Sequence, residues 1–515
     1  MELHAGGSLM RVGAASSVLS PVPVATSLPS AGTIVGGLAA ALVAIAVLAW
    51  LMRRYAQALP LLAIVALPFR LPISADGRTV NLLIPIYLVV AAGTLVRLLP
   101  ALLARLAQRG GAAAYAGEVP RQGAGEVAPG VDARTPRELA FWASPRGLTW
   151  LLFGAVCLYA LQIAYSADRV KALENIAFFY VPFALLFALL VQVRWTRELL
   201  MRCLVSLASL AVVFAGVGFV EYDRKSLFLN PKVVAADQYD NYFRVNSVFF
   251  DPSIYGRFLA LVMIALCTLV LWNRNRRVVI AGAVALAWLL AGLVTSFSQS
   301  SIAALLLGLA VLAAWRWSVV WTVYVSAAVL ALGALVLLVA PASLHFGLKG
   351  SSGSTNNATN GRTSLVSGGL ELFAKRPLEG YGSGSFVTEY KRHSHADAQS
   401  ATSASHTIPV TIAAEQGILG LAVYAALLLS AFIVLFRGAG RSPPRMAIAA
   451  CFAALVLHTW TYADFLEDPF TWTLLAIGVA LARQAAAAYA EDDPGTEAVA
   501  TGAGAAGAGA PASSF

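Results

Sequence analysis

Charged residues are scarce in this chain: Asp, Glu, Lys and Arg together make up 12% of its 515 residues. A water-soluble domain carries about twice that share, so the composition excludes an ordinary soluble protein. Hydrophobic residues account for 59%, and long apolar runs recur from about residue 31 to residue 487. Each run is near the ~20 residues that span a bilayer, whereas a barrel would show shorter alternating segments. The sequence predicts an all-α, polytopic transmembrane helical bundle.

Cysteine is rare as well: the four cysteines all lie within apolar runs and show no CxxC spacing. This pattern excludes a disulfide framework and a thiolate metal site, and it indicates small packing residues. The first 30 residues contain no apolar core behind a basic start, so we expect no cleavable signal peptide. The net charge of +10 fits Lys and Arg in the cytoplasmic loops of a membrane protein better than binding to nucleic acid.

The apolar runs predict about 12–13 spans. The run at 57–72 is the weakest, because it is short and contains Pro60, Pro68 and Arg70. The predicted spans cover approximately 31–52, 57–72, 80–104, 148–166, 174–193, 198–219, 254–273, 278–296, 298–315, 318–340, 417–436, 445–463 and 469–487. The expected organisation is an N-terminal tail (1–30), helices (31–104), a cytoplasmic linker insertion (105–147), helices (148–219), a first outer loop (220–253), helices (254–340), a large, partly helical outer loop (341–416), C-terminal helices (417–487) and a disordered cytoplasmic tail (488–515).

Basic clusters set the predicted orientation. If residues 105–147, which carry six arginines, are cytoplasmic, alternation of the spans brings the other basic clusters inside as well. These clusters are Arg53–Arg54, Arg194–Arg202, Asn273–Arg277, Arg316 and Arg437–Arg445. The acidic turn Tyr462–Pro469 then falls outside. This agreement with the positive-inside rule predicts that both long loops are extracytoplasmic.

The second outer loop is rich in histidine and basic residues. Four of the six histidines lie in it or at its edge: His345, His393, His395 and His406. It also holds six Lys or Arg residues, Arg362 and Arg376 among them. Positive charge on this side of the membrane indicates a phosphate or diphosphate ligand. The alternative is that a loop of this length is translocated whatever its charge.

His406 precedes a short predicted helix at the end of this loop. Thr407 suits its N-cap, Pro409 its first turn and Gly417 its C-terminal end. Gly417 and Gly420 allow close backbone approach where the next span enters the membrane. A histidine can accept a proton from a hydroxyl near neutral pH, because its unperturbed pKa is about 6.5. The alternative is a solvated interfacial histidine.

Three segments form an ordered set of motifs. The first is the segment Arg244–Gly256, and the second is Gly361–Arg362 with the turn Pro377–Phe386. The third begins at His406 and Thr407, which are followed by nine residues and then by Gly417-x-x-Gly420. In these motifs the chain resembles the O-antigen ligase and O-antigen polymerase family of bacterial membrane glycosyltransferases. The resemblance covers about residues 140–465.

Two positions depart from the family pattern. Thr407 stands where Asn, Ser or Gly is usual, and Gln299, within Ser296–Ser301, occupies the place of an arginine in many relatives. If that arginine binds a phosphate in relatives, Arg244 or a basic residue of the second loop is expected to substitute for it.

The resemblance implies transfer of a glycan from a polyprenyl-diphosphate carrier to an acceptor hydroxyl. The reaction would take place at the outer face of the bacterial cytoplasmic membrane, in cell-surface polysaccharide biosynthesis. It implies His406 as the catalytic base, with inversion at the anomeric carbon. Arg244, Arg362 and Arg376 would bind the donor diphosphate. Supporting roles fall to Gln299, Glu415 and Tyr381, and structural ones to Gly361, Gly380, Gly382, Gly417 and Gly420.

Several alternatives stay open at this level. Glu415 either orients a neighbour or faces the polar loop, and Tyr381 either stacks on a sugar ring or anchors the interface. The chain has no Asp-x-Asp pair, so we expect neither a metal nor a cofactor. A transporter or flippase of a lipid-linked saccharide would instead place functional charges within the spans. A structural membrane protein is the third class, and ligase and polymerase remain equally open.

Overall fold

The computed structural model describes residues 31–75, 78–104, 137–228, 243–339, 362–394, 405 and 407–491. Nine helical segments in this part of the chain are long and apolar enough to cross a membrane. They are α1 (Ala31–Arg54), α3 with η1 (Ile84–Gly93 and Thr94–Leu98), α7 with η2 and α8 (Arg169–Asn175, Ile176–Tyr180 and Val181–Leu190), α9 (Arg197–Arg224), α11 (Pro252–Trp272), α12 (Arg276–Thr295), α13 (Gln299–Arg316), α18 (Ile408–Phe436) and α20 (Pro469–Glu491).

Three further helices of 18 to 21 residues belong to the same bundle: α6 (Pro145–Gln162), α14 (Val319–Val339) and α19 (Pro443–Thr461). The short helices α5 (Arg137–Trp142) and η4 (Ala439–Arg441) precede α6 and α19. The prediction of an all-α, polytopic helical bundle is confirmed.

The predicted span at 57–72 is wrong. Its residues form α2 (Ala58–Ala66), a helix of only nine residues, and then enter an antiparallel hairpin. The hairpin consists of β1 (Leu71–Ala75) and β2 (Arg78–Leu82). Pro68 contributes to the early end of α2, because proline has no amide hydrogen to continue the helical hydrogen bonds, although Leu67 before it still has helical backbone angles.

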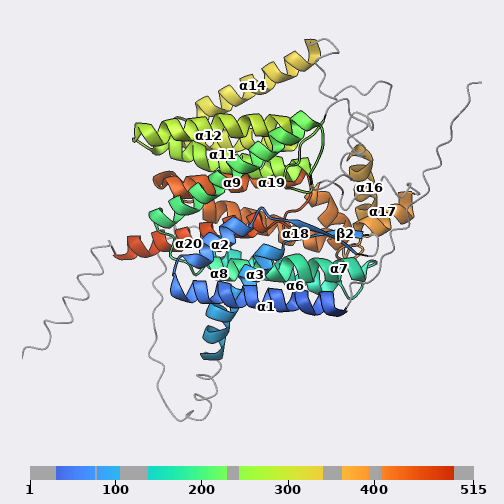
Figure 1. Ribbon diagram of the computed structural model, residues 1–515. Helices are drawn as coiled ribbons and strands as arrows, with labels where there is room; N and C mark the ends of the chain where they lie inside the picture. The colour runs from blue at the N-terminus through green and yellow to red at the C-terminus, as the bar shows by residue number, and fades with distance from the viewer. Residues whose placement is uncertain are drawn as a thin grey trace, which may run out of the picture.

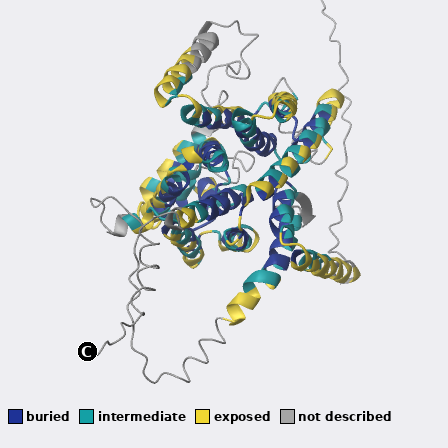
Figure 2. Ribbon diagram, turned by 90° about the vertical axis from the view of Figure 1, so that its left-hand side faces the viewer, coloured by how far each residue is buried: buried dark blue, intermediate teal, exposed yellow. Residues whose placement is uncertain are grey.

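Helix α11 forms the centre of the bundle. Every residue from Pro252 to Ile264 is buried, and the helix packs against α9, α12, α13 and α19. Peripheral helices expose apolar faces, drawn in yellow in Figure 2, and Leu38, Leu42 and Val43 of α1 are 61–67% exposed. Hydrocarbon tails are as apolar as leucine, so such faces are stable against lipid.

Polar contacts tie the helices together at one end of this core. Arg257 Nη2 of α11 lies 2.7 Å from Asp468 Oδ2, and the two side chains are 2% and 0% exposed. The other oxygen of Asp468 accepts a hydrogen bond from the Phe470 amide at 2.9 Å, at the start of α20. Ser301 of α13 lies 3.2 Å from His458 Nε2 of α19. The turn between α19 and α20 is therefore fixed to the core.

The second long loop contributes two helices to the described structure, as predicted. They are α16 (Arg362–Lys375) and α17 (Phe386–Ser394), which pack against each other and against α18. Figure 1 shows them in orange-brown at the end of the bundle where α7 also lies. The opposite ends of the long helices lie far from this region.

Candidate functional site

A sharp turn, Pro377–Phe386, joins α16 to α17. Its glycines Gly380, Gly382 and Gly384 have φ angles of +67°, +89° and +73°, which side-chain-bearing residues rarely adopt. The space beside the turn is also filled, because a Cβ on Gly382 would collide with the backbone of Ser166. Glycine is required here so that the turn can lie directly against the connection between α6 and α7.

The same turn is bonded to the backbone of α18. The Gly382 amide donates to the Glu415 carbonyl at 2.7 Å. The Ile418 amide donates to the Pro377 carbonyl, also at 2.7 Å. Between these bonds Gly417 breaks the helix with φ 65° and ψ −161°. The short helix predicted between Thr407 and Gly417 is therefore present, and it ends in a kink against the turn.

The Glu415 side chain makes a second connection between α18 and the turn. Its carboxylate is 8% exposed and accepts hydrogen bonds from the Gly384 amide at 2.9 Å and the Phe386 amide at 3.0 Å. Phe386 begins α17, and the first amides of a helix have no partner within it. Glu415 thus holds both the turn and the start of α17.

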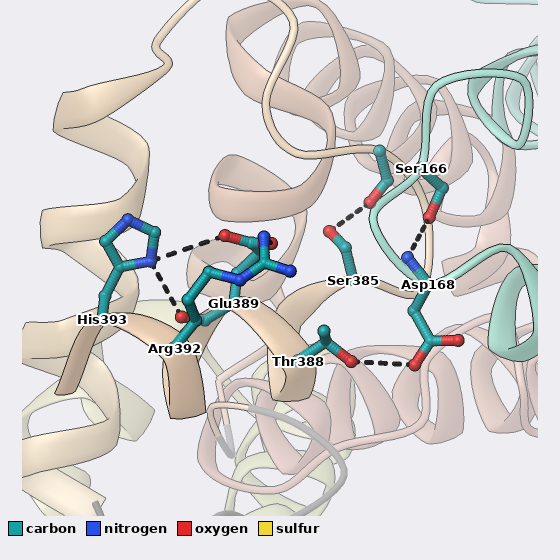
Figure 3. Close-up of polar contacts among 8 residues, drawn as sticks. Ser166, Asp168, Ser385, Thr388, Glu389, Arg392 and His393 are labelled. Atoms are coloured by element: carbon teal, nitrogen blue, oxygen red, sulfur yellow. Dashed lines mark hydrogen bonds and ion pairs between the residues drawn. The ribbon is translucent and has the colours of Figure 1, made fainter. Parts of the chain in front are cut away.

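On its other side the turn is bonded to the α6–α7 connection. The Ser166 hydroxyl donates to the Ser383 carbonyl at 2.7 Å. Asp168 caps α7 by accepting from the Lys171 amide at 3.0 Å, and its second oxygen accepts from the Thr388 hydroxyl of α17 at 2.9 Å. In Figure 3, Asp168 and Thr388 point toward each other across this junction. The turn therefore fixes α7, α17 and α18 relative to one another.

A cavity of about 570 Å³ lies where these segments meet. Along α18 its wall changes in character. Before the kink the polar residues Thr411, Glu415 and Gln416 line the cavity together with Ile408 and Ile412, whereas Val423 and Leu427, beyond the kink, are apolar. The cavity thus has a polar part beside the loops and an apolar part along a membrane-spanning helix.

Two of the described residues that line the cavity are basic: Lys171 of α7 and Lys391 of α17. Arg392 and His393 of α17 instead contact Glu389 of the same helix (Figure 3). Arg392 Nη1 lies 2.6 Å from Glu389 Oε1, and His393 Nδ1 lies 3.0 Å from the Glu389 carbonyl oxygen. Lys171 Nζ lies 3.6 Å from Glu174 Oε2 of its own helix, so an anion that enters the cavity would meet Lys391 and a lysine that already has an acidic neighbour.

Carboxylates and an amide line the polar part as well. Burial raises the pKa of Glu467, in the turn before α20, to about 7, and the negative charge of nearby Asp464 acts in the same direction. Asn175 Nδ2 donates to Glu467 Oε1 at 3.0 Å and to the Tyr159 hydroxyl at 2.9 Å. Acidic side chains on the wall are Asp168, Glu174, Glu415, Asp464 and Glu467. The described wall thus combines many polar and charged groups with apolar residues.

Residues 284–425 match the model of the O-antigen ligase family. This segment belongs to that family. It runs from α12 to the part of α18 beyond the kink, and it contains the turn Pro377–Phe386, Glu415 and both glycines of the Gly417-x-x-Gly420 motif. The resemblance predicted from the loop motifs is confirmed. A comparison with curated proteins found no match to the chain.

The cavity extends beyond the O-antigen ligase segment. Lys171 and Asn175 precede the segment and Glu467 follows it. The chain is thus a multi-pass membrane protein with an O-antigen ligase domain whose cavity is completed by flanking helices. This combination supports a membrane glycosyltransferase of the O-antigen ligase or polymerase type.

Two of the three predicted donor-binding arginines, Arg376 and Arg244, are not among the residues that line the cavity. Arg376 is exposed, and its guanidinium carbon lies 4.7 Å from the ring centre of Tyr381, which is itself buried. Arg244 Nε donates to the Ser296 carbonyl at 3.3 Å. Gln299 is exposed at the first residue of α13. None of these side chains is among the residues that line the cavity.

His406 and Gly361 lie outside the described residues. Arg362 is the first residue of α16, and its side chain is also outside the description. The neighbours of His406 are described: Ser405 is buried, and its hydroxyl donates to the Thr407 carbonyl at 2.7 Å. The roles of His406, Arg362 and Gly361 stay predictions.

Sequence reasoning missed Lys171 and Asn175, and it gave Glu467 no role in the site. The signals for them in the sequence were weak: Lys171 lies in a short connection between two predicted spans, and Glu467 is one of several acids in the turn Tyr462–Pro469. Within the described residues, no group of three or more His, Cys, Asp or Glu side chains is arranged to bind a metal ion. Metal-free chemistry stays a prediction.

A second cavity, of about 670 Å³, lies between α9, α11, α19 and α20. Its lining is mostly apolar, with residues such as Leu204, Val262 and Ile477, and Arg197 is the charged residue on its described wall. Hydrocarbon fits such a wall, whereas ionised and hydrogen-bonding groups do not. The polar candidate site is therefore the first cavity.

Proposed function

We propose that the protein transfers a glycan from a polyprenyl-diphosphate carrier to an acceptor hydroxyl at the outer face of the bacterial cytoplasmic membrane. The observation that carries this proposal is the change of the cavity wall along α18 from polar Thr411 and Glu415 to apolar Val423 and Leu427. A lipid-linked saccharide has the same division into a polar head and a hydrocarbon chain. The O-antigen ligase segment, which contributes this wall, supports the same substrate class.

Positive charge would bind and activate the leaving group. Lys171 and Lys391 lie on the cavity wall, so we assign them to the diphosphate and keep Arg244, Arg362 and Arg376 as further candidates. Cations placed where negative charge grows stabilise the transition state, more strongly where water is partly excluded. Loss of the lysines is therefore expected to slow the reaction as well as to weaken donor binding.

His406 is proposed as the general base. The acceptor oxygen attacks the anomeric carbon while its proton passes to the imidazole, and the bond from that carbon to the diphosphate oxygen breaks. The lipid diphosphate leaves with the electron pair, and a single displacement inverts the configuration. Ile408, two residues after His406 and the first of α18, lines the cavity, which supports the choice of a base from this part of the chain.

The orientation of the chain follows from its basic clusters. The cytoplasmic linker and the clusters at Arg53–Arg54, Asn273–Arg277 and Arg437–Arg445 are assigned to the inside. The segments α16, α17 and the α19–α20 turn then lie outside, where a flipped lipid-linked donor is available.

The test compares the wild type with His406→Ala in liposomes that contain a polyprenyl-diphosphate oligosaccharide. Lipid-linked core saccharides and repeat units are supplied as acceptors, and both extended glycan and released lipid diphosphate are measured. The proposal predicts product from the wild type and a loss of at least about 100-fold in the variant, the size of a general-base contribution.

The matched control is His393→Ala. His393 belongs to the same loop but contacts Glu389 and lies near Tyr381 rather than on the cavity wall, so this variant should keep its activity. Equal activity of His406→Ala and the wild type would remove the base from the mechanism. Movement of the polyprenyl-diphosphate oligosaccharide from one leaflet of the liposome to the other, without any transfer product, would favour a transporter instead.

A further inference from the structure

The side-chain amide of Asn175 donates hydrogen bonds, but its oxygen accepts none among the described residues. It is 4% exposed at the end of α7, and its Nδ2 donates to the Tyr159 hydroxyl at 2.9 Å and to Glu467 Oε1 at 3.0 Å. Both amide hydrogens are therefore engaged, which also fixes which end of the amide is oxygen. The Oδ1 atom is buried and has no hydrogen-bond partner among the described residues. Buried polar atoms in proteins rarely lack a partner.

Asn175 and Glu467 both line the cavity, although 292 positions separate them in the sequence. Their meeting depends on the turn before α20, which is held firmly. Asp468, next to Glu467, is paired with Arg257 of α11 at 2.7 Å, and Trp472 Nε1 donates to the Leu466 carbonyl at 2.8 Å. Glu467 is thus presented to the cavity by a rigid support, which is the requirement for a selective contact.

Two aromatic rings lie beside this pair. Tyr159 and Tyr180 also line the cavity, and their rings are stacked with centroids 4.2 Å apart. The Tyr159 oxygen already accepts a hydrogen bond from Asn175, so its own proton is available for donation. The patch therefore offers hydrogen-bond acceptors at Asn175 and Glu467, a hydroxyl donor, and apolar ring surface.

We propose that Asn175 and Glu467 form a saccharide-binding subsite that accepts hydrogen bonds from adjacent sugar hydroxyls. A sugar presents hydroxyl donors close together and a C–H face that packs on aromatic rings, so its chemistry matches the patch. A bare diphosphate or a hydrocarbon chain does not match, because neither donates hydrogen bonds to a carboxylate. The subsite rests on the proposed function, since it would hold a sugar of the donor or of the acceptor.

Binding in detergent tests this subsite without requiring turnover. The probes are a polyprenyl-diphosphate oligosaccharide, the bare polyprenyl diphosphate and the free acceptor oligosaccharide, with native mass spectrometry as the readout. The wild type should bind the polyprenyl-diphosphate oligosaccharide about tenfold or more tightly than the bare polyprenyl diphosphate, or should bind the free acceptor oligosaccharide about tenfold or more tightly than the variants Glu467→Gln and Asn175→Leu do, as expected for one or two hydrogen bonds.

Glu467→Gln and Asn175→Leu should reduce this preference to about threefold or less while binding of the bare lipid stays unchanged. The matched control is Glu379→Gln, which alters an exposed carboxylate of the turn Pro377–Phe386 away from the cavity wall. Loss of preference for the donor assigns the subsite to the donor sugar, and loss for the acceptor assigns it to the acceptor.

The wild-type result alone can overturn the proposal, even if a variant fails to fold. A wild type that binds the bare and saccharide-bearing lipids equally and does not bind the free acceptor has no such subsite, and an unchanged preference in both folded variants rules out these two residues. Saccharide preference without any transfer in the liposome assay would keep the subsite and reject the proposed reaction.

Discussion

The Glu415 carboxylate accepts a hydrogen bond from the Gly384 amide at 2.9 Å, across 31 positions of sequence. Through this bond the first part of α18 holds the glycine-rich turn that closes one side of the cavity. The order of the site thus depends on a buried side chain that need not touch the substrate.

Replacing Glu415 with alanine should disorder the turn. The amides of Gly384 and Phe386 would lose their acceptor, and each hydrogen bond to a charged group contributes about 1.5–3 kcal/mol. We expect a lower unfolding temperature in detergent and a loss of transfer activity of about 100-fold or more. Glu371→Gln is the control, because it removes only an exposed pair with Lys375. A Glu415→Ala protein with full activity and unchanged stability would show that the turn keeps its conformation without these two hydrogen bonds.

Gly417→Ala should be damaging for a conformational reason. With φ 65° and ψ −161°, the residue lies in a region essentially restricted to glycine, and strain there costs about 1–3 kcal/mol. A Cβ would in addition collide with the Leu378 carbonyl. Gly154→Ala in α6 is the matched control, since a Cβ there meets no described atom within 4 Å. Thermal unfolding of both variants side by side measures the difference, and equal unfolding temperatures would contradict the kinked geometry.

The buried pair of Arg257 and Asp468 should show strong coupling. Asp468→Leu or Arg257→Met alone leaves one buried charge without compensation and should destabilise the protein by about 3–5 kcal/mol. The double variant Arg257→Met with Asp468→Leu removes both charges and should recover much of that loss. Unfolding of all four proteins under one detergent condition completes the cycle. Additive losses would mean that the two side chains do not interact.

Stability should depend on pH through Glu467. Burial and the nearby Asp464 raise its pKa from 4.5 to about 7, with Glu415 acting in the same direction and Lys171 and Arg70 opposing it. Between those pH values the folded protein holds a proton that the unfolded chain has released, so stability falls as pH rises through this window. Above pH 7 the contribution is constant.

Glu467→Gln removes this titration and isolates its effect. The unfolding temperature of the wild type, taken relative to the variant, should fall from pH 4.5 to pH 7 and then level off. Thermal unfolding across pH 4 to 8, about four or five points, is sufficient to trace the curve. A flat difference would place Glu467 in a more solvated environment than the structure gives it.

Hydropathy predicted most of the fold because each long apolar run must satisfy its backbone as a helix in lipid. It failed at 57–72, where α2 ends at Ala66 and residues 71–75 pair with 78–82 in a hairpin despite the apolar composition. Glycine patterns were equally informative for the turn Pro377–Phe386 and for the kink at Gly417, since both depend on local backbone geometry.

The cavity was less predictable because its walls come from distant parts of the chain. Asn175 and Glu467 meet only through tertiary packing, and no local pattern links them. Charge alone did not distinguish the basic residues of the second loop by the contacts that they make. Arg376, proposed for the donor, lies over the Tyr381 ring, and Arg392 is paired with Glu389. The sequence showed where basic residues were abundant, but not which of them their own neighbours engage.

The most direct test is a structure of His406→Ala with a polyprenyl-diphosphate oligosaccharide bound, determined in a lipid nanodisc. The account predicts the sugar in contact with Asn175 and Glu467, the diphosphate beside Lys171 or Lys391, and the lipid chain along Val423 and Leu427. A saccharide located instead in the apolar cavity between α9, α11 and α20, or on the surface beside Arg376, would contradict it.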